Sequence, residues 1–324
     1  MVAKDHILRF TDRWMLPSAI VAGISIYLIY HFSPALYYLG PVFNHSLSEG
    51  QRLLIAILMF FQFVKMSPGD VLIRKWHLKA LSIQVAACIV LGFLSVAVPA
   101  GLGRILLQSA MLCFICPTAS AAGVITDRLG GSLAGTVTYL VIIDVAASFI
   151  IPAMIPVVHP AEGLSFWIYM VRIAGRIMPM LILPGILAWT IRYTLPGLQR
   201  ILRPIADYSV MIWGIALTIA MILATRALVT SDLSPWSLVL IGLTASACCA
   251  IQFAAGRTIG KKSVSPDGKS DRNTAGQALG QKNTGFLIWL GYTALTPVTA
   301  IAGGIYAIVQ NLFNTWELRR YGSK

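Results

Sequence analysis

Charged residues are scarce in this sequence. Asp, Glu, Lys and Arg make up 11% of its 324 residues, whereas apolar residues make up 57%. A soluble domain of this length needs far more charge to cover its surface. The composition therefore excludes an ordinary soluble protein and indicates a chain that lies mostly in lipid.

Polar interruptions are also few, so the apolar residues form long runs. A helix needs about 20 apolar residues to cross the hydrocarbon layer. Lipid offers backbone groups no partner, so spans are helices or closed barrels, and these runs lack the alternation of a barrel. We predict an all-α membrane protein in which residues 1–324 form one transmembrane unit. The ten expected spans are residues 14–32, 51–67, 79–99, 102–127, 131–157, 165–191, 207–229, 234–256, 272–290 and 291–316.

The polar joins between these spans are short. The longest covers residues 256–272, and a Pro-rich join covers residues 193–204. We expect both to be cytoplasmic loops. Residues 1–32 resemble a signal peptide, but no small-residue cleavage site follows them, so we interpret them as containing the first span.

Acidic residues are fewer than basic ones, 12 against 25, which gives a net charge of +13. In a ten-span model with both termini inside, the basic residues gather in the cytoplasmic loops. Only Arg52, Arg104 and Arg226 fall in outer loops. This asymmetry follows the positive-inside rule, so the basicity indicates orientation and not a nucleic-acid partner. We expect a multi-pass protein of a bacterial inner (plasma) membrane, with both termini cytoplasmic.

Residues that usually carry catalysis or metals are few and scattered. Cys113 and Cys116 have the spacing of a redox or metal motif, but no second pair accompanies them, which favours buried free thiols. No histidine pair with metal-ligand spacing lies inside a span, and Asp144 has no partner carboxylate. We therefore expect no enzyme, catalytic residue, cofactor or metal site.

Two expected spans are interrupted at their centres. Residues 116–123 place proline and small residues in the fourth span, and residues 280–285 place glycine and polar residues in the ninth. Both residue classes weaken a helix. The interruptions fall in the fourth span of each half, which predicts inverted repeats over residues 1–160 and 161–324. Paired broken spans of this kind mark the substrate site of secondary transporters, and free helix N-termini there suit an anion.

At these residues the sequence resembles the bile acid:sodium symporter family, over residues 58–316. The resemblance implies ten helices in two inverted repeats. It groups spans 3–5 and 8–10 into a core domain, and spans 1, 2, 6 and 7 into a panel domain. It also implies organic-anion substrates, with sodium as the usual coupling ion. The residues that carry it are Lys65, Ser67, Pro68 and Asp70; Cys116 to Ser120, Val124, Thr126 and Gly131; and Gly280, Asn283 to Gly285, Pro297, Gln310 and Asn311.

The sequence departs from this family where sodium should bind. Thr136 remains on the fifth span, but most of the other oxygen-bearing side chains are replaced. Sodium requires several oxygen ligands, and an ammonium at Lys282 would repel it. We infer that sodium coupling is lost. The replacing residues are Cys88, Ala122, Gly123, Leu140, Ala278 and Lys282.

Lys282 and Asp144 are charged residues far from either membrane surface. Ionisable residues inside spans usually line transport pathways. Asp144 shares a helix face with Thr136 and Ser148, which is the face that bears ion ligands in the family. We therefore expect Lys282, Asp144 and Thr136 to form a coupling site in which Asp144 is the counter-ion or proton carrier. The alternative is a structural ion pair.

Thr118, Ser120, Asn283 and Thr284 lie beside the interruptions. The resemblance places Ser120 and Asn283 at substrate-contacting positions. Together with Lys282, these four residues are the expected substrate-binding residues, although the same residue types also cap helices.

Two arginines of the sixth span, Arg172 and Arg176, lie one turn apart. They would attract anions at the outer mouth, or they would extend to the membrane interface as long basic side chains commonly do.

The resulting hypothesis is an alternating-access transporter of a carboxylate-bearing organic anion. We expect it to be sodium-independent, with proton coupling through Lys282 and Asp144 as one mode and uniport as another. The alternatives are a sodium symporter whose sodium sites are made by backbone carbonyls, a channel, and a membrane sensor that binds the ligand without moving it. The substrate's size stays open, because side-chain identities do not give a cavity volume.

Overall fold

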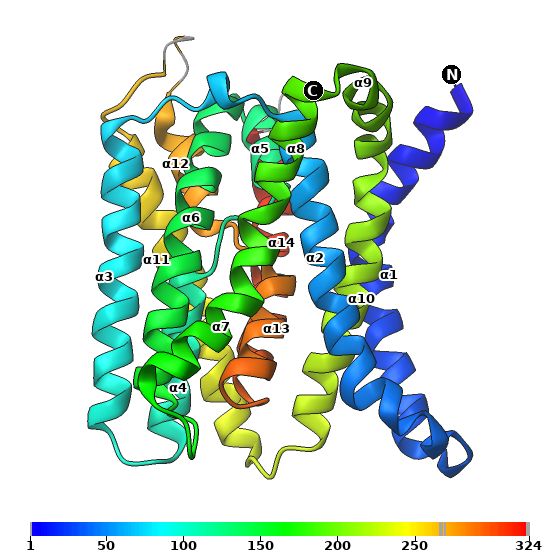
Figure 1. The fold of residues 1–324 in the computed structure, drawn as a ribbon, viewed down its shortest axis with the longest axis vertical. Helices are drawn as coiled ribbons and strands as arrows, with labels where there is room; N and C mark the ends of the chain where they lie inside the picture. Colours follow the sequence, from blue (N-terminus) through cyan, green and yellow to red (C-terminus); the bar gives the residue numbers. More distant parts are fainter. Residues whose placement is uncertain (1, 266–267, 269, 322–324) are drawn as a thin grey trace.

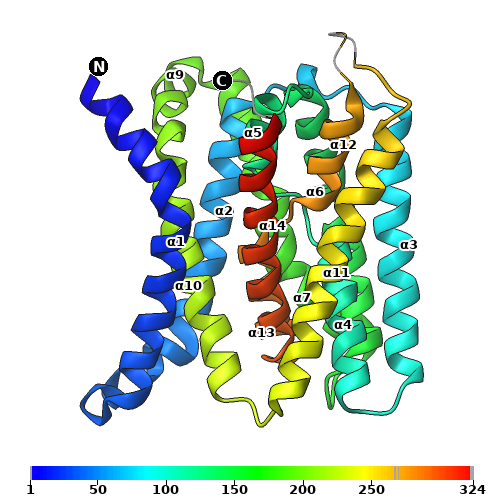
Figure 2. The same ribbon diagram turned by 180° about the vertical axis from the view of Figure 1, so that it is seen from behind.

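The computed structural model describes residues 2–265, 268 and 270–321, and these form a helical bundle without extended strands. The two ends of the chain lie at the same end of the bundle (Figures 1 and 2). The first half contains α1 (Val2–Phe32), α2 (Leu47–Lys65), α3 (Lys75–Ala97), α4 (Leu102–Ile115), α5 (Ala122–Arg128) and α6 (Leu133–Val158). The second half contains α7 (Phe166–Leu181), α8 (Leu183–Thr194), α9 (Pro196–Ile205), α10 (Ser209–Val229), α11 (Pro235–Gly260), α12 (Asp271–Gly280), α13 (Thr284–Ala294) and α14 (Thr299–Tyr321).

Six helical segments of the described chain are long and apolar enough to cross a membrane. Two shorter apolar helices, Pro17–Phe32 and Leu102–Ile115, accompany them. Many large apolar side chains also face outward, as expected where lipid is the solvent. The predicted all-α membrane protein is therefore confirmed at this level. The six segments are Leu47–Lys65, Lys75–Ala97, Leu133–Val158, Phe166–Thr194, Pro196–Val229 and Pro235–Gly260.

Both predicted interruptions are present as gaps in helix. Residues 116–121 separate α4 from α5, and residues 281–283 separate α12 from α13. Pro117 lacks a backbone donor, which explains the first gap. In Figures 1 and 2, α5 and α12 lie toward the end with the termini, and α4 and α13 toward the opposite end, so the two gaps lie between them.

Some predicted boundaries were wrong. The join at residues 193–204 contains helix α9, because Pro196 is at the first helical position, where a missing N–H costs nothing. The expected boundary between the last two spans, at residue 291, lies inside α13, and the chain leaves helix only between Ala294 and Thr299. The sixth expected span is divided into α7 and α8 at Ile182.

The interrupted helix α12 packs closely against α11. A Cβ atom on Gly256 would collide with the Ala275 carbonyl, and one on Gly260 with the Asp271 carbonyl. Glycine at these two positions therefore lets the two backbones touch, which fixes the depth of α12 and of the gap that follows it.

Candidate substrate site at the crossing of two interrupted helices

The two gaps pair with each other. Thr118 and Lys282 form an antiparallel bridge. The Ala119 N–H donates to the Gln281 carbonyl at 2.9 Å, and the Asn283 N–H donates to the Pro117 carbonyl at 2.9 Å. Backbone that leaves a helix at membrane depth needs partners from protein, since lipid supplies none. Each gap supplies the other with those partners, so the crossing is one structural unit.

Side chains satisfy the helix ends around this pairing. The Thr118 hydroxyl donates to the Ala278 carbonyl at 2.6 Å, and the Tyr306 hydroxyl donates to the Gly280 carbonyl at 2.7 Å. These are carbonyls of the last turn of α12, which lack helical partners. The proton of the Thr118 hydroxyl is therefore committed to a helix end. In this conformation Thr118 can offer a ligand only its oxygen lone pairs.

The backbone of Lys282 is held from the last helix. Gln310 on α14 accepts from the Lys282 N–H at 2.9 Å and donates to the Lys282 carbonyl at 3.1 Å. One glutamine amide thus pairs with both backbone groups of a residue, as a neighbouring strand would. This brings α14 into the crossing as a third element.

The ammonium of Lys282 is fully buried and donates to the Phe114 carbonyl at 3.2 Å. Phe114 lies in the last turn of α4, where unpaired carbonyls carry partial negative charge. The thiols of Cys113, Cys116 and Cys249 lie close to the ammonium. Lys282 therefore places a positive charge at the C-terminal end of one half-helix.

Asp144 does not pair with this ammonium. Its carboxylate is 1% exposed, and neither oxygen has a hydrogen-bond partner in the described part of the chain. No ion pair joins it to Lys282 among the described residues. Cys116 interacts electrostatically with both groups, which places it near each of them. The expected counter-ion arrangement is therefore absent from this conformation, because Lys282 turns to the end of α4 instead.

Thr136 lies elsewhere on α6. Its hydroxyl lies 2.9 Å from the Thr126 hydroxyl of α5 and 3.3 Å from the Ser132 carbonyl. Eight residues of helix separate it from Asp144, which is about 12 Å along the axis. Thr136 thus connects α5 to α6, and among the described residues no hydrogen bond joins it to Lys282 or Asp144.

Two expected substrate-binding residues, Asn283 and Thr284, lie at the start of α13, and a third, Ser120, lies in the other gap. The Asn283 side-chain oxygen accepts from the Phe286 N–H at 3.2 Å, which makes it the N-cap. Asn283 and Ser120 are both partly exposed, whereas Thr284 is 6% exposed. The first N–H groups of α13 and the Asn283 amide nitrogen are suited to an anion. The structure thus places Ser120 and Asn283 in the two gaps and leaves both partly exposed.

Sequence reasoning missed Gln51 on α2. This side chain is fully buried, and neither of its amide atoms has a partner among the described residues. A Cβ atom on Gly285 would lie 3.0 Å from the Gln51 amide nitrogen, so the amide reaches the first turn of α13. Its signal in the sequence is an amide at the start of an apolar run, Leu53–Phe61.

Gln84 on α3 was also missed. Its amide nitrogen donates to the Phe114 carbonyl and lies 3.5 Å from the Cys116 carbonyl, and its oxygen accepts from the Tyr139 hydroxyl. Gln84 lies one turn before Cys88, one of the residues named above as replacing an oxygen-bearing side chain. It joins Lys282 at the end of α4, so an amide and an ammonium share that helix terminus.

The described residues contain no cluster of three or more His, Cys, Asp or Glu side chains that could hold a metal ion. Comparison with models of protein families and with curated proteins gives no match.

Proposed function

We propose that this chain is a secondary transporter of an organic anion that works by alternating access. The observation that carries the proposal is the antiparallel pairing of two interrupted helices, Thr118 with Lys282, deep in an apolar bundle. Irregular backbone at membrane depth is costly and occurs where it lines a protein-enclosed or aqueous site. In transporters such paired broken helices form the substrate site near the bilayer midplane.

The proposed architecture has ten spans in two inverted repeats, as in the bile acid:sodium symporter family. The first repeat would comprise α1, α2, α3, α4 with α5, and α6. The second would comprise α7 with α8, α10, α11, α12 with α13, and α14. Two features support this assignment: an interrupted helix is the fourth member of each set, and an odd number of spans inverts the second set.

A plasma-membrane location with both termini cytoplasmic completes this proposal. Helix α9, with its basic residues Arg200 and Arg203, lies at the end of the bundle that carries both termini (Figure 1). The positive-inside rule assigns such an end to the cytoplasm.

The proposed substrate is a carboxylate-bearing solute. The start of α13 offers N–H groups, the Asn283 amide nitrogen and the Thr284 hydroxyl, and Ser120 adds a hydroxyl from the other gap. All of these groups can donate to an anion. The buried ammonium of Lys282 adds positive potential to the same region.

We further propose that transport is independent of sodium. The ammonium of Lys282 already occupies the end of α4 as a tethered cation, on a carbonyl that would otherwise attract a mobile one. Proton coupling through Asp144 is the alternative to uniport, since a buried carboxylate without a partner can take up a proton.

Uptake into liposomes tests this proposal. Purified protein is reconstituted and offered a panel of radiolabelled carboxylates, with sodium or choline outside and with or without a proton gradient. We expect saturable uptake of at least one acid and equal rates in the two cations. Binding without uptake would favour a ligand sensor, and sodium-dependent uptake would indicate sodium sites made by backbone carbonyls.

Thermal unfolding in sodium and choline chloride provides a separate test of the tethered cation. The wild type should unfold at the same temperature in both salts. Lys282→Met should gain a saturable sodium-specific rise, because the carbonyl at the end of α4 then lacks its ammonium. Lys261→Met, which removes an exposed charge after α11, should show no such rise.

A further inference from the structure

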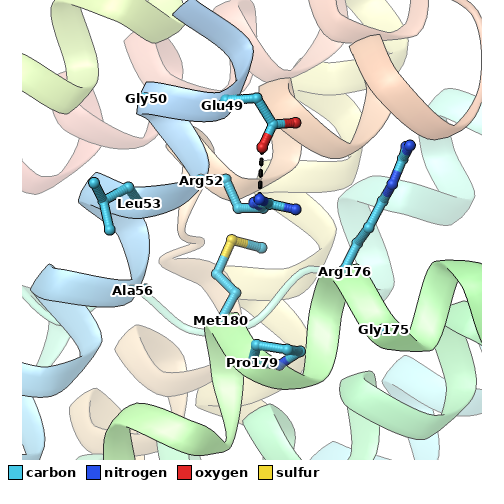
Figure 3. A pocket seen from close by; sticks show the side chains of 9 residues that line it. All are labelled: Glu49, Gly50, Arg52, Leu53, Ala56, Gly175, Arg176, Pro179 and Met180. Carbon is cyan, nitrogen blue, oxygen red and sulfur yellow. Dashed lines mark ion pairs between the residues drawn. The ribbon is translucent and has the colours of Figure 1, made fainter. Parts of the chain in front are cut away.

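A cavity of about 580 Å³ lies between α2 and α7, away from the crossing itself. Figure 3 shows Arg52 and Met180 pointing into the gap between the two helices, whereas the Arg176 side chain extends from α7 in a direction away from both. The Arg52 guanidinium pairs with the Glu49 carboxylate at 2.6 Å. Arg176 has no acidic partner among the described residues. The charged side chains of the lining therefore sum to one net positive charge.

The rest of the lining is largely apolar. Leu53 and Ala56 contribute from α2, and Met180 contributes from α7. Leu53 is 62% exposed and follows the charged residues Glu49 and Arg52 on α2. Ligand cavities of 300–1,000 Å³ typically combine an apolar wall with a few polar groups that fix orientation, and this cavity has both the size and the composition.

We propose that this cavity is a binding site for a monoanion with an apolar body, of the carboxylate class, and that it receives the substrate before the crossing does. The proposal rests on the transport function proposed above. The apolar part of the ligand would contact Leu53, Ala56 and Met180. Its carboxylate would contact Arg176, with Arg52 as a second guanidinium that Glu49 holds in place.

The charge of the cavity selects the class of ligand. A guanidinium binds a carboxylate through two parallel N–H donors. One carboxylate neutralises the net charge of Glu49, Arg52 and Arg176, whereas a dianion would leave an excess negative charge beside Glu49. The geometry therefore favours a monocarboxylate over a phosphate monoester.

The same stretch of α2 also reaches the crossing. Gln51 lies between the cavity residues Gly50 and Arg52, but its amide is directed to the first turn of α13. A carboxylate that leaves the guanidinium groups would find the next donors on the same turn of α2, in Gln51, and then at the start of α13. One face of this turn of α2 thus lines the cavity, and Gln51 on another face reaches the first turn of α13.

The test uses full-length protein in nanodiscs of phosphatidylcholine. Thermal unfolding is measured against increasing 2-naphthoate and octanoate, each compared with its neutral amide. We expect at least one acid to raise the unfolding temperature saturably, and its amide to have no saturable effect. Arg176→Gln and Arg52→Gln should each weaken the apparent affinity by about tenfold or more, the value of a charged hydrogen bond. Arg172→Gln removes the same charge one turn away, outside the lining, and should change it little.

Three outcomes would overturn the proposal. The first is that neither acid has a saturable effect on the wild type. The second is that Arg176→Gln and Arg172→Gln bind equally well. The third is that phosphatidylglycerol in the disc abolishes the acid's effect, because an anionic lipid then occupies the cavity.

The liposome assay separates this proposal from the transport function. Acid binding without uptake would support the cavity site and contradict the transporter. Uptake at equal rates by Arg176→Gln and the wild type, with no saturable effect of the acid on unfolding, would support the transporter and contradict the cavity site.

Discussion

The contact between Gln310 and Lys282 allows the most direct test of the crossing. Gln310 is 4% exposed, and its amide makes hydrogen bonds of 2.9 and 3.1 Å with the N–H and carbonyl of Lys282. Gln310→Leu keeps the size and the helix propensity of the side chain but removes both bonds. It leaves one backbone donor and one backbone acceptor buried without partners.

The expected cost follows from these two groups. A buried polar group without a partner costs about 1–3 kcal/mol. Hydrogen bonds between membrane helices average only about 0.6 kcal/mol, because the unfolded chain in lipid also finds partners. The two groups of Lys282 are backbone groups at a gap, where no helix replaces the partner. We therefore expect Gln310→Leu to lower the free energy of unfolding by about 2–4 kcal/mol.

Asn311→Ala is the matched control on the next residue. The Asn311 amide donates to the Ala307 carbonyl of its own helix at 2.7 Å. Without the Asn311 amide, the Ala307 carbonyl still accepts from the N–H of its own helix. The free energy of unfolding should therefore fall by less than about 1 kcal/mol. Equilibrium unfolding in mixed detergent micelles, titrated with a denaturing detergent, measures the free energy of unfolding of both variants. If Gln310→Leu costs no more than Asn311→Ala, the gap does not depend on α14 and this description of the crossing is wrong.

Two further substitutions concern buried polar groups without partners. Asp144→Leu should raise the free energy of unfolding by about 1–3 kcal/mol, since it removes a buried polar group that has no partner. The same variant should remove any pH dependence of uptake in the liposome assay. If the variant keeps the pH dependence of the wild type, Asp144 does not carry the coupled proton. Gln51→Leu should stabilise the protein without ligand by about 1–3 kcal/mol but lower carboxylate uptake. Unchanged uptake in that variant would refute substrate contact by α2.

The interruptions could be predicted from the sequence because their causes are local. Pro117 removes a backbone donor, and the segment 280–285 combines glycine with polar residues in an apolar span. The structure has its gaps at residues 116–121 and 281–283. Helix α9 was not predicted, because the prolines of residues 193–204 indicated a loop, whereas Pro196 begins the helix. In both cases the residue's position within the helix decides the outcome.

The side-chain partners could not be predicted in the same way. Helical periodicity places Asp144 on a face, but it does not say which neighbouring helix covers that face. Gln51, Gln84 and Gln310 lie on three different helices and are all directed to the two gaps. Their roles depend on helix packing that only the structure provides. An amide in an apolar span is nevertheless a usable signal, since burying it without a partner is costly.

The position of the Lys282 ammonium limits how a proton could drive transport. Its hydrogen bond to the Phe114 carbonyl ties the charge to the end of α4, and Asp144 lies outside ion-pair distance. Deprotonation of Lys282 would therefore weaken the crossing directly, whereas protonation of Asp144 would act on α6 alone. Direct proton transfer between the two groups requires α6 to move relative to the crossing. A coupled cycle thus requires the pair to form in another conformation. An Asp144→Cys, Lys282→Cys double variant, made in a chain whose five native cysteines are replaced, would detect that conformation if it cross-links only in the presence of substrate.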